Sequence, residues 1–178
     1  MLCLNSGRPL IVILKSGRTT IIHKCNIDGI VIRALEKHTD ARGWLIELFR
    51  SDECTDDLRP AMSYISMTLP GVVRGPHEHR KQTDYFCFFG LSSFRIFLWD
   101  NRSDSPTFGN KFVFEAGEGN MVSFIVPPGV VHAYKNIGEV EGLVFNAPDR
   151  LYRGPGRAEE PDEIRYEENI GSRFHLDD

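Results

Sequence analysis

The strongest constraint on this chain is a series of short strand-like runs at regular spacing. Runs rich in β-branched and aromatic residues recur about every ten residues, separated by segments rich in glycine, proline and asparagine. No amphipathic pattern of three helical turns precedes Pro148. Many short strands at this spacing predict an all-β sandwich or barrel, jelly rolls included. We expect strands at residues 10–14, 19–22, 29–35, 43–49, 62–68, 85–89, 93–99, 111–115, 121–126 and 142–146.

The length of the chain indicates a single domain. Its 178 residues are enough for one hydrophobic core and too few for two ordinary ones. We expect an N-terminal arm of extra strands over residues 1–26 and a barrel over residues 27–147. The polar segment over residues 148–178 should wrap the surface of the same domain.

The composition excludes several classes of function. A net charge of −4 argues against a nucleic-acid partner. The four cysteines are scattered without a C-x-x-C pair, which is typical of free thiols in a reducing cytosol. The apolar run at residues 10–14 is shorter than a signal-peptide core or a membrane span. We therefore predict a cytoplasmic protein with neither a nucleic-acid nor a membrane partner.

Three histidines and one aspartate form the clearest candidate site. His77 and His79 are two residues apart, so on a strand they point to the same face. Asp84 follows where a neighbouring strand would bring its carboxylate alongside, and His132 follows a Pro-Gly turn. If His132 lies opposite the first two, the group suits Zn, Mn, Fe, Ni or Co rather than Ca or Mg. The same imidazoles are also suited to proton transfer near neutral pH.

These segments resemble the two signature motifs of the cupin superfamily, G-x5-H-x-H-x3,4-E-x6-G and G-x5-P-x-G-x2-H-x3-N. The resemblance implies a double-stranded β-helix, which is a small jelly-roll barrel. The residues that match are Gly71, His77, His79, Gly90, Pro127, Gly129, His132 and Asn136, with Asp84 in place of the glutamate.

A narrower resemblance, over residues 27–170, is to the 3,5-epimerases of dTDP-4-keto-6-deoxyglucose in rhamnose synthesis. It is carried by "DARGWLIELF", "GVVRGPH", "DNRSDSPTFG", "VPPGVVHAY" and "EIRYEENIG". "DNRSDSPTFG" resembles the family's D-x-R-x-x-S-P-T-F-G and is the longest match. The resemblance implies epimerisation of a nucleotide-linked 4-ketosugar by proton abstraction next to the ketone, with no cofactor.

The same resemblance implies roles for individual residues. His77 matches the family's base, and Glu168 is the residue nearest to the aspartate that pairs with this base. His132 matches a second active-site histidine, and Arg74 an arginine that contacts the substrate. Either Arg74 or Lys81 could stabilise the enolate.

Further residues should hold the nucleotide. Arg42 and Glu47 match residues that reach the nucleotide from a partner subunit, in a homodimer that exchanges N-terminal strands. Arg102 is among the arginines available for the diphosphate, because a guanidinium binds phosphate through two parallel hydrogen bonds.

The chain departs from the epimerase pattern at two places. Phe145 occupies the position of the family's catalytic tyrosine, and a phenyl ring cannot donate a proton. Tyr134 or Tyr85 would then return the proton, or His79 would return it on the same face. In addition, the run "HEHRK" resembles the H-A-H-K motif of dTDP-sugar 3,4-ketoisomerases, which need no metal.

Two other functions stay open at this point. A metal-dependent cupin enzyme, such as a dioxygenase or a sugar-phosphate isomerase, would use His77, His79, Asp84 and His132 as ligands. A non-catalytic sugar-binding cupin would explain the loss of the tyrosine at Phe145.

Overall fold

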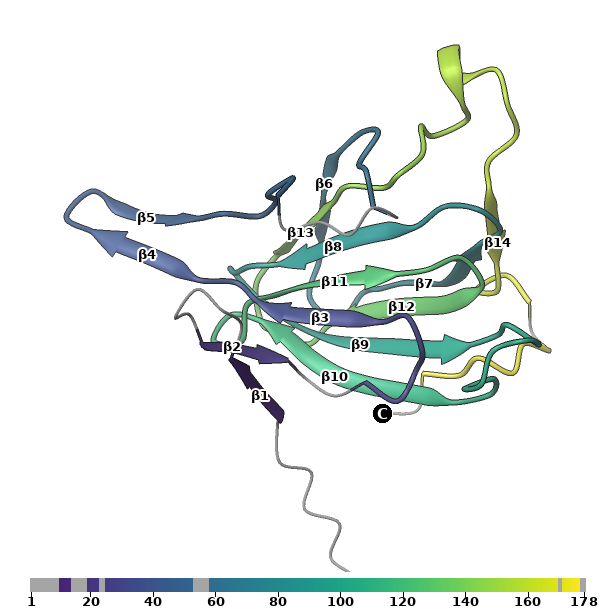
Figure 1. Ribbon diagram of the computed structural model, residues 1–178, viewed down its shortest axis with the longest axis horizontal. Helices are drawn as coiled ribbons and strands as arrows, with labels where there is room; N and C mark the ends of the chain where they lie inside the picture. Colours follow the sequence, from purple (N-terminus) through teal and green to yellow (C-terminus); the bar gives the residue numbers. More distant parts are fainter. Residues whose placement is uncertain (1–9, 14–18, 23–24, 53–57, 170, 177–178) are drawn as a thin grey trace, which may run out of the picture.

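The structure is a computed structural model that describes residues 10–13, 19–22, 25–52, 58–169 and 171–176. Two five-stranded antiparallel sheets form the body (Figure 1). The first, called here the β7 sheet, has the order β10 (Lys111–Gly117), β9 (Ser93–Asp100), β12 (Val130–Asn136), β7 (Val73–His79) and β14 (Glu163–Arg165). The second, the β8 sheet, has the order β3 (Val31–Ala34), β11 (Val122–Val126), β8 (Asp84–Phe88), β13 (Gly142–Asn146) and β6 (Tyr64–Thr68).

The core lies between the two sheets and is built from their alternating inward residues. Phe88 of the β8 sheet meets Phe94 and Tyr134 of the β7 sheet, with ring centroids 5.1 and 5.3 Å apart. Burial of each such aromatic side chain contributes on the order of 2 kcal/mol. The expected jelly-roll architecture is confirmed, and the only helical element in the described residues is the short 3-10 turn η1 (Pro155–Arg157). No helix of this part of the chain is long and apolar enough to cross a membrane.

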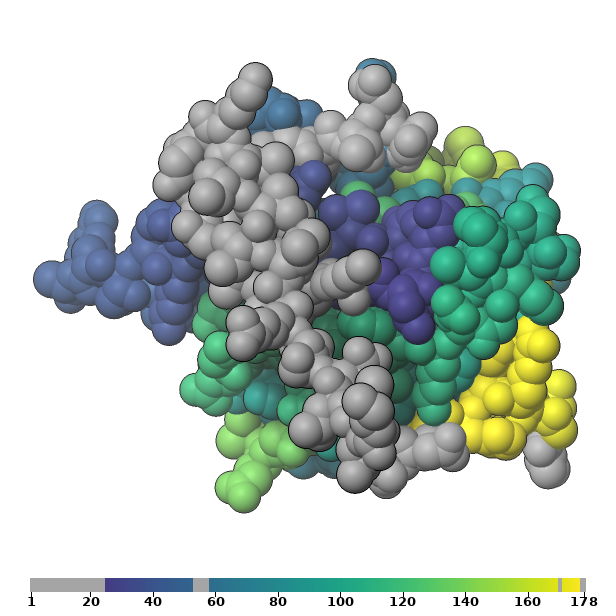
Figure 2. Space-filling model, turned by 60° about the horizontal axis from the view of Figure 1, so that its bottom comes forward, coloured from purple at the N-terminus to yellow at the C-terminus, as the bar shows by residue number. Residues whose placement is uncertain are grey.

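Two small antiparallel pairs lie outside these sheets. β1 (Leu10–Ile13) pairs with β2 (Thr19–Ile22), within the segment expected to be an arm. β4 (Lys37–Asp40) pairs with β5 (Gly43–Ile46) in a hairpin that projects from the body in both views (Figure 1; Figure 2). The segment before β3 contacts the start of β10: Asn26 Nδ2 donates to the carbonyl oxygen of Lys111, and Asn110 Nδ2 donates to the carbonyl oxygen of Asn26. Figure 2 shows this contact as purple atoms against teal-green ones.

The C-terminal segment is fixed to the outer face of the β7 sheet. Phe174 packs on Trp99, with ring centroids 5.8 Å apart. The buried carboxylate of Glu78 accepts hydrogen bonds from the Tyr166 hydroxyl (2.6 Å) and from Asn101 Nδ2 (3.1 Å). These contacts hold β14 against β7 and so place its side chains at the edge of the histidine cluster.

Three observed strands that the sequence did not predict, β4, β7 and β12, have weak local strand propensity. β4 is polar and exposed, and β7 contains Gly75 and Pro76, which rarely occur inside strands. β12 mixes histidine, lysine and asparagine with apolar residues. In each case the pairing with a neighbouring strand outweighs the local propensity.

Candidate active site

The three predicted histidines meet on the inner face of the β7 sheet. His77 and His132 are direct neighbours in the register of β7 and β12, and their ring centroids are 4.3 Å apart. His79 lies one pleat further along β7, 5.8 Å from His77 and 5.9 Å from His132. One nitrogen from each ring lies within 4.8 Å of the others. The strand-based prediction of a shared face is therefore confirmed.

Asp84 joins this cluster from the opposite sheet. Its side chain is 1% exposed, and its Oδ2 atom lies 3.2 Å from His79 Nε2 and 3.5 Å from His132 Nε2. Its Oδ1 atom accepts hydrogen bonds from Asn146 Nδ2 (2.9 Å) and Gln82 Nε2 (3.0 Å). Although burial opposes ionisation, the hydrogen bond from His79 and the nearby imidazoles lower the pKa of Asp84 to about 2. The carboxylate is thus ionised and shared by the cluster.

The hydrogen bonds of His79 favour its charged form. His79 Nδ1 lies 2.7 Å from the carbonyl oxygen of Asp162 and donates to it. Its Nε2 atom can then donate to Asp84 only if both ring nitrogens carry protons. Burial works against the charge, but the hydrogen bond and the charge of Asp84 outweigh it and raise the pKa of His79. His79 and Asp84 therefore form a buried ion pair.

His77 is held in the neutral form. Burial, followed by the neighbouring imidazoles of His132 and His79, lowers the pKa of His77 to about 2. Its Nδ1 atom lies 3.8 Å from Glu163 Oε1, while Glu163 Oε2 binds Arg165 Nη2 at 2.8 Å. A neutral imidazole can accept a proton, and a carboxylate beside it stabilises the imidazolium that forms.

The predicted partner of this base needs a correction. The carboxylate beside His77 belongs to Glu163. β14 pairs with β7 so that Arg165 lies opposite His77 and Glu163 opposite His79, and the Glu163 side chain reaches diagonally to His77. Glu168 is exposed in the turn that follows β14. The motif alignment placed the acidic residue five positions too late, since it did not account for this short strand.

His132 is the most deeply buried of the three rings, and burial lowers its pKa. Its Nδ1 atom lies 3.1 Å from the carbonyl oxygen of Val130. Its Nε2 atom has no hydrogen-bond partner in the described residues, although Asp84 is close. A buried polar atom without a partner is costly and marks a position where a ligand group could bind.

Two tyrosines lie near the cluster in different settings. The hydroxyl of Tyr134 lies 3.1 Å from Ser66 Oγ, and its ring is only 6% exposed within the core. Tyr64, on β6, is 46% exposed, and its hydroxyl oxygen accepts a hydrogen bond from Asn146 Nδ2 at 2.8 Å. Phe145 alternates with Asn146 along β13 and points to the other face of the sheet.

Arg102 has a structural role in this chain. Its Nε and Nη2 atoms each lie 2.8 Å from the carboxylate of Asp100, and Nη2 also donates to the carbonyl oxygen of Asp28. Ser105 and Thr107 complete the hydrogen bonding of the same carboxylate. The "DNRSDSPTFG" segment is therefore a turn held together by the Asp100 carboxylate and tied to Asp28, and its arginine is already engaged.

Of the other residues expected to bind substrate, Arg74 lies on β7 and Lys81 follows this strand. Arg74 binds β6 through Thr68 Oγ1 (2.9 Å) and the carbonyl oxygen of Met67 (2.8 Å). Lys81 has an exposed side chain, and its backbone N–H donates to Asp162 Oδ2. Arg42 lies on the projecting hairpin.

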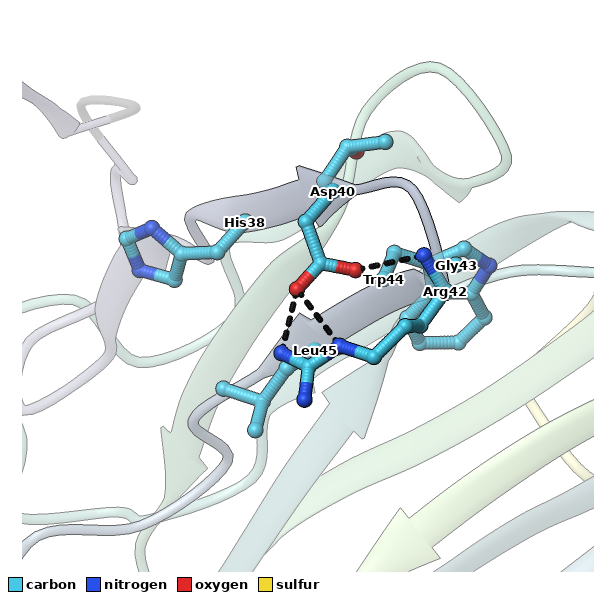
Figure 3. A pocket seen from close by; sticks show the side chains of 7 residues that line it. His38, Asp40, Arg42, Gly43, Trp44 and Leu45 are labelled. Atoms are coloured by element: carbon cyan, nitrogen blue, oxygen red, sulfur yellow. Dashed lines mark hydrogen bonds and ion pairs between the residues drawn. The ribbon is translucent and has the colours of Figure 1, made fainter.

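Figure 3 shows the hairpin end, where Arg42 donates to the carboxylate of Asp40 beside Trp44. Glu47, just after β5, lies 3.3 Å from Arg50. Arg42 is thus on the projecting hairpin, whereas Glu47 lies at its base, next to Leu48, whose carbonyl oxygen accepts a hydrogen bond from Tyr85 of β8.

Comparison with known proteins places the chain in a family. Residues 24–156 match the family model described as dTDP-4-dehydrorhamnose 3,5-epimerase. A protein of Haloferax volcanii described as "probable low-salt glycan biosynthesis epimerase Agl13" is 41% identical over 142 residues, which are 79% of this chain and 87% of that protein. The Bacillus subtilis spore coat polysaccharide biosynthesis protein SpsL is 34% identical over 154 residues, covering 85% of this chain and 98% of that one.

The fold agrees with solved structures. The dTDP sugar isomerase of Desulfovibrio desulfuricans superimposes with a TM-score of 0.70 at 23% identity, covering 79% of this chain and 85% of that chain. The chain therefore belongs to the dTDP-4-dehydrorhamnose 3,5-epimerase family and is an isomerase of the epimerase class.

Proposed function

We propose that the protein epimerises a dTDP-linked 4-keto-6-deoxy sugar, with His77 as the base. The observation that carries this proposal is the position of the His77 imidazole beside the Glu163 carboxylate, 3.8 Å from Nδ1 to Oε1, on the inner face of the barrel. The C–H bonds next to a ketone are acidic enough for an imidazole to remove the proton. The names of the family and of the Haloferax relative support the reaction class.

The cluster also has a group that can stabilise the enolate. The ion pair with Asp84 keeps His79 protonated, and its ring lies 5.8 Å from that of His77. A fixed positive charge in a partly dry site stabilises developing negative charge more strongly than it would in water. Arg74 and Lys81 are proposed to contact the sugar or its diphosphate from the rim.

Turnover by matched variants tests the role of His77. His77→Asn should lower the rate of conversion of dTDP-4-keto-6-deoxyglucose by about 10²–10⁴-fold, the usual contribution of a general base. The control His175→Asn changes an exposed histidine of the C-terminal segment and should retain the wild-type rate. Equal rates for both variants would exclude His77 as the base.

We further propose that the protein acts as a homodimer in which the β4–β5 hairpin reaches the partner's site. Trp44 and Leu45 are 50% and 60% exposed on this hairpin, which is more apolar surface than an isolated projection should show. Arg42 would then contact the nucleotide of the neighbouring subunit. The double variant Trp44→Glu/Leu45→Glu should elute as a monomer with a raised KM, and a monomeric wild type would contradict the proposal.

A metal-dependent reaction is the second candidate, and the three converging histidine nitrogens favour it. These donors fit a first-row transition metal, but Asp84 and His79 would have to exchange their ion pair for the metal. We propose that no metal is needed. Turnover should survive prolonged chelation, and about one tightly held equivalent of metal that is lost together with activity would favour the alternative.

We also infer a cytoplasmic location. Cys25 and Cys87 are free thiols within the described residues, which suits a reducing compartment.

A further inference from the structure

Inversion at a carbon needs two groups, one on each face of the sugar. The base removes the proton from one face, and an acid must return a proton from the other. Phe145, which stands at the family's tyrosine position, has no proton to give and points away from the cluster. The proton donor must therefore come from elsewhere in this chain.

Tyr134 is buried in the core, which makes it unsuited to this role. It belongs to β12, the strand that carries His132 and pairs with the strand of His77, so base and tyrosine share one wall of the barrel. Its ring is also packed in the core against Phe88 and Phe94. Its hydroxyl reaches across to Ser66 Oγ of β6 at 3.1 Å, but only 6% of the residue is exposed, so a sugar lying against the histidines would not contact it.

Tyr64 lies on the opposite wall, at the open edge of the β8 sheet. It is the direct cross-strand neighbour of Asn146, so the two side chains share the inward face. Asn146 binds the Asp84 carboxylate, which in turn contacts His79 and His132. Through these contacts the Tyr64 hydroxyl is attached to the same cluster, yet nearly half of the residue's surface stays accessible to a ligand.

The hydrogen bonding leaves the Tyr64 proton available. The Asn146 amide donates to the hydroxyl oxygen at 2.8 Å, so the oxygen acts as an acceptor there and its own O–H can point elsewhere. Partial burial, together with the negative charge of Asp84, raises the pKa of Tyr64 to about 12. The hydroxyl thus keeps its proton at neutral pH until a strong base, such as an enolate carbon, takes it.

We propose that Tyr64 is the catalytic acid that replaces the tyrosine missing at Phe145. This inference rests on the proposed function of His77. His77 takes the proton from the carbon next to the ketone, and the C–H electron pair becomes the enolate. The Tyr64 O–H bond then breaks as a new C–H bond forms on the opposite face. Water takes the proton from the His77 imidazolium and returns one to the Tyr64 phenolate, so the enzyme is restored.

The test measures inversion and solvent exchange separately, with dTDP-4-keto-6-deoxyglucose in D₂O. Tyr64→Phe removes one hydroxyl from a half-exposed ring, so the fold should be retained. We expect inversion to fall at least about 100-fold, while deuterium still enters the unchanged substrate at a rate within about threefold of wild type. His77 can still remove and return a proton on its own face.

Other outcomes would overturn the proposal. Tyr64 would be excluded as the acid that acts after proton abstraction by either of two results. One is inversion by Tyr64→Phe within about threefold of wild type, and the other is an equal loss of inversion and exchange. The same separation in Tyr134→Phe would assign the role to Tyr134 instead. Failure of the base proposal looks different, because His77→Asn would then retain both activities. As a second variant, 3,5-difluorotyrosine at position 64 should move the alkaline limb of the inversion rate to lower pH, and an unmoved limb would contradict the proposal.

Discussion

Replacing His77 by glutamine should make the protein more resistant to acid. The pKa of His77 is lowered from 6.5 to about 2 by burial and by the neighbouring imidazoles. Below pH 6.5 the unfolded chain therefore binds a proton at this position that the folded chain does not bind, so a fall in pH favours unfolding. Glutamine does not titrate, and it removes this contribution.

The magnitude follows from the two pKa values. At pH 7 the unfolded chain is mostly neutral at His77, and the cost is about 0.2 kcal/mol. At pH 5 it is almost fully protonated, and the cost reaches about 2 kcal/mol. The side chain of His77 is 17% exposed, so solvent screening reduces this value only modestly.

The assay is urea unfolding followed by tryptophan fluorescence at several pH values between 7 and 5. The difference in unfolding free energy between His77→Gln and wild type should move by about 2 kcal/mol in favour of the variant over this range. His175→Gln, at an exposed position, serves as the control and should follow wild type. If the unfolding free energies of wild type and His77→Gln changed in parallel with pH, the folded protein would protonate His77 as readily as the unfolded chain does.

Three further predictions concern Asp84, Glu163 and Asp100. Asp84→Asn should cost about 3 kcal/mol of stability, because it leaves the buried His79 without its counter-charge. This loss should be largest between about pH 4 and 6.5. Asp84, with its lowered pKa, is ionised throughout this range, and His79, with its raised pKa, is charged throughout it. Urea unfolding at several pH values measures the loss. Glu163→Gln should lower kcat by about tenfold or more with little change in KM, while Glu168→Gln should match wild type in steady-state kinetics. Asp100→Ala should lower the free energy of unfolding by about 2–3 kcal/mol, because Arg102, Ser105 and Thr107 lose their shared acceptor. A rise in KM with no loss of stability would instead show that Arg102 binds the substrate.

Much of the fold could be predicted from local pattern. The runs that became β8, β9 and β11 alternate apolar residues or are continuously apolar, so their strand character is visible without tertiary information. β7 could be placed only through its histidine pair, because glycine and proline hide the strand signal. β14 depends on pairing with β7 and has only three residues, too few for a periodic pattern.

The site was predictable to the extent that it rests on strand alternation. The shared face of His77 and His79 follows from their spacing, and the family motifs bring in His132 and Asp84. Glu163 and Tyr64 were missed, because their positions depend on the register between strands far apart in the sequence. Strand register is set by packing and pairing across the sheets, so it cannot be inferred from any one short segment of the sequence.

The central claim is that His77 removes a proton next to the ketone of a nucleotide-linked 4-ketosugar. It is tested most directly by NMR of dTDP-4-keto-6-deoxyglucose incubated in D₂O with wild type and with His77→Asn. We predict that wild type replaces hydrogen by deuterium at C3 or C5, and that the variant leaves both positions protonated. Undiminished exchange by the variant, or no exchange by wild type, would contradict the claim.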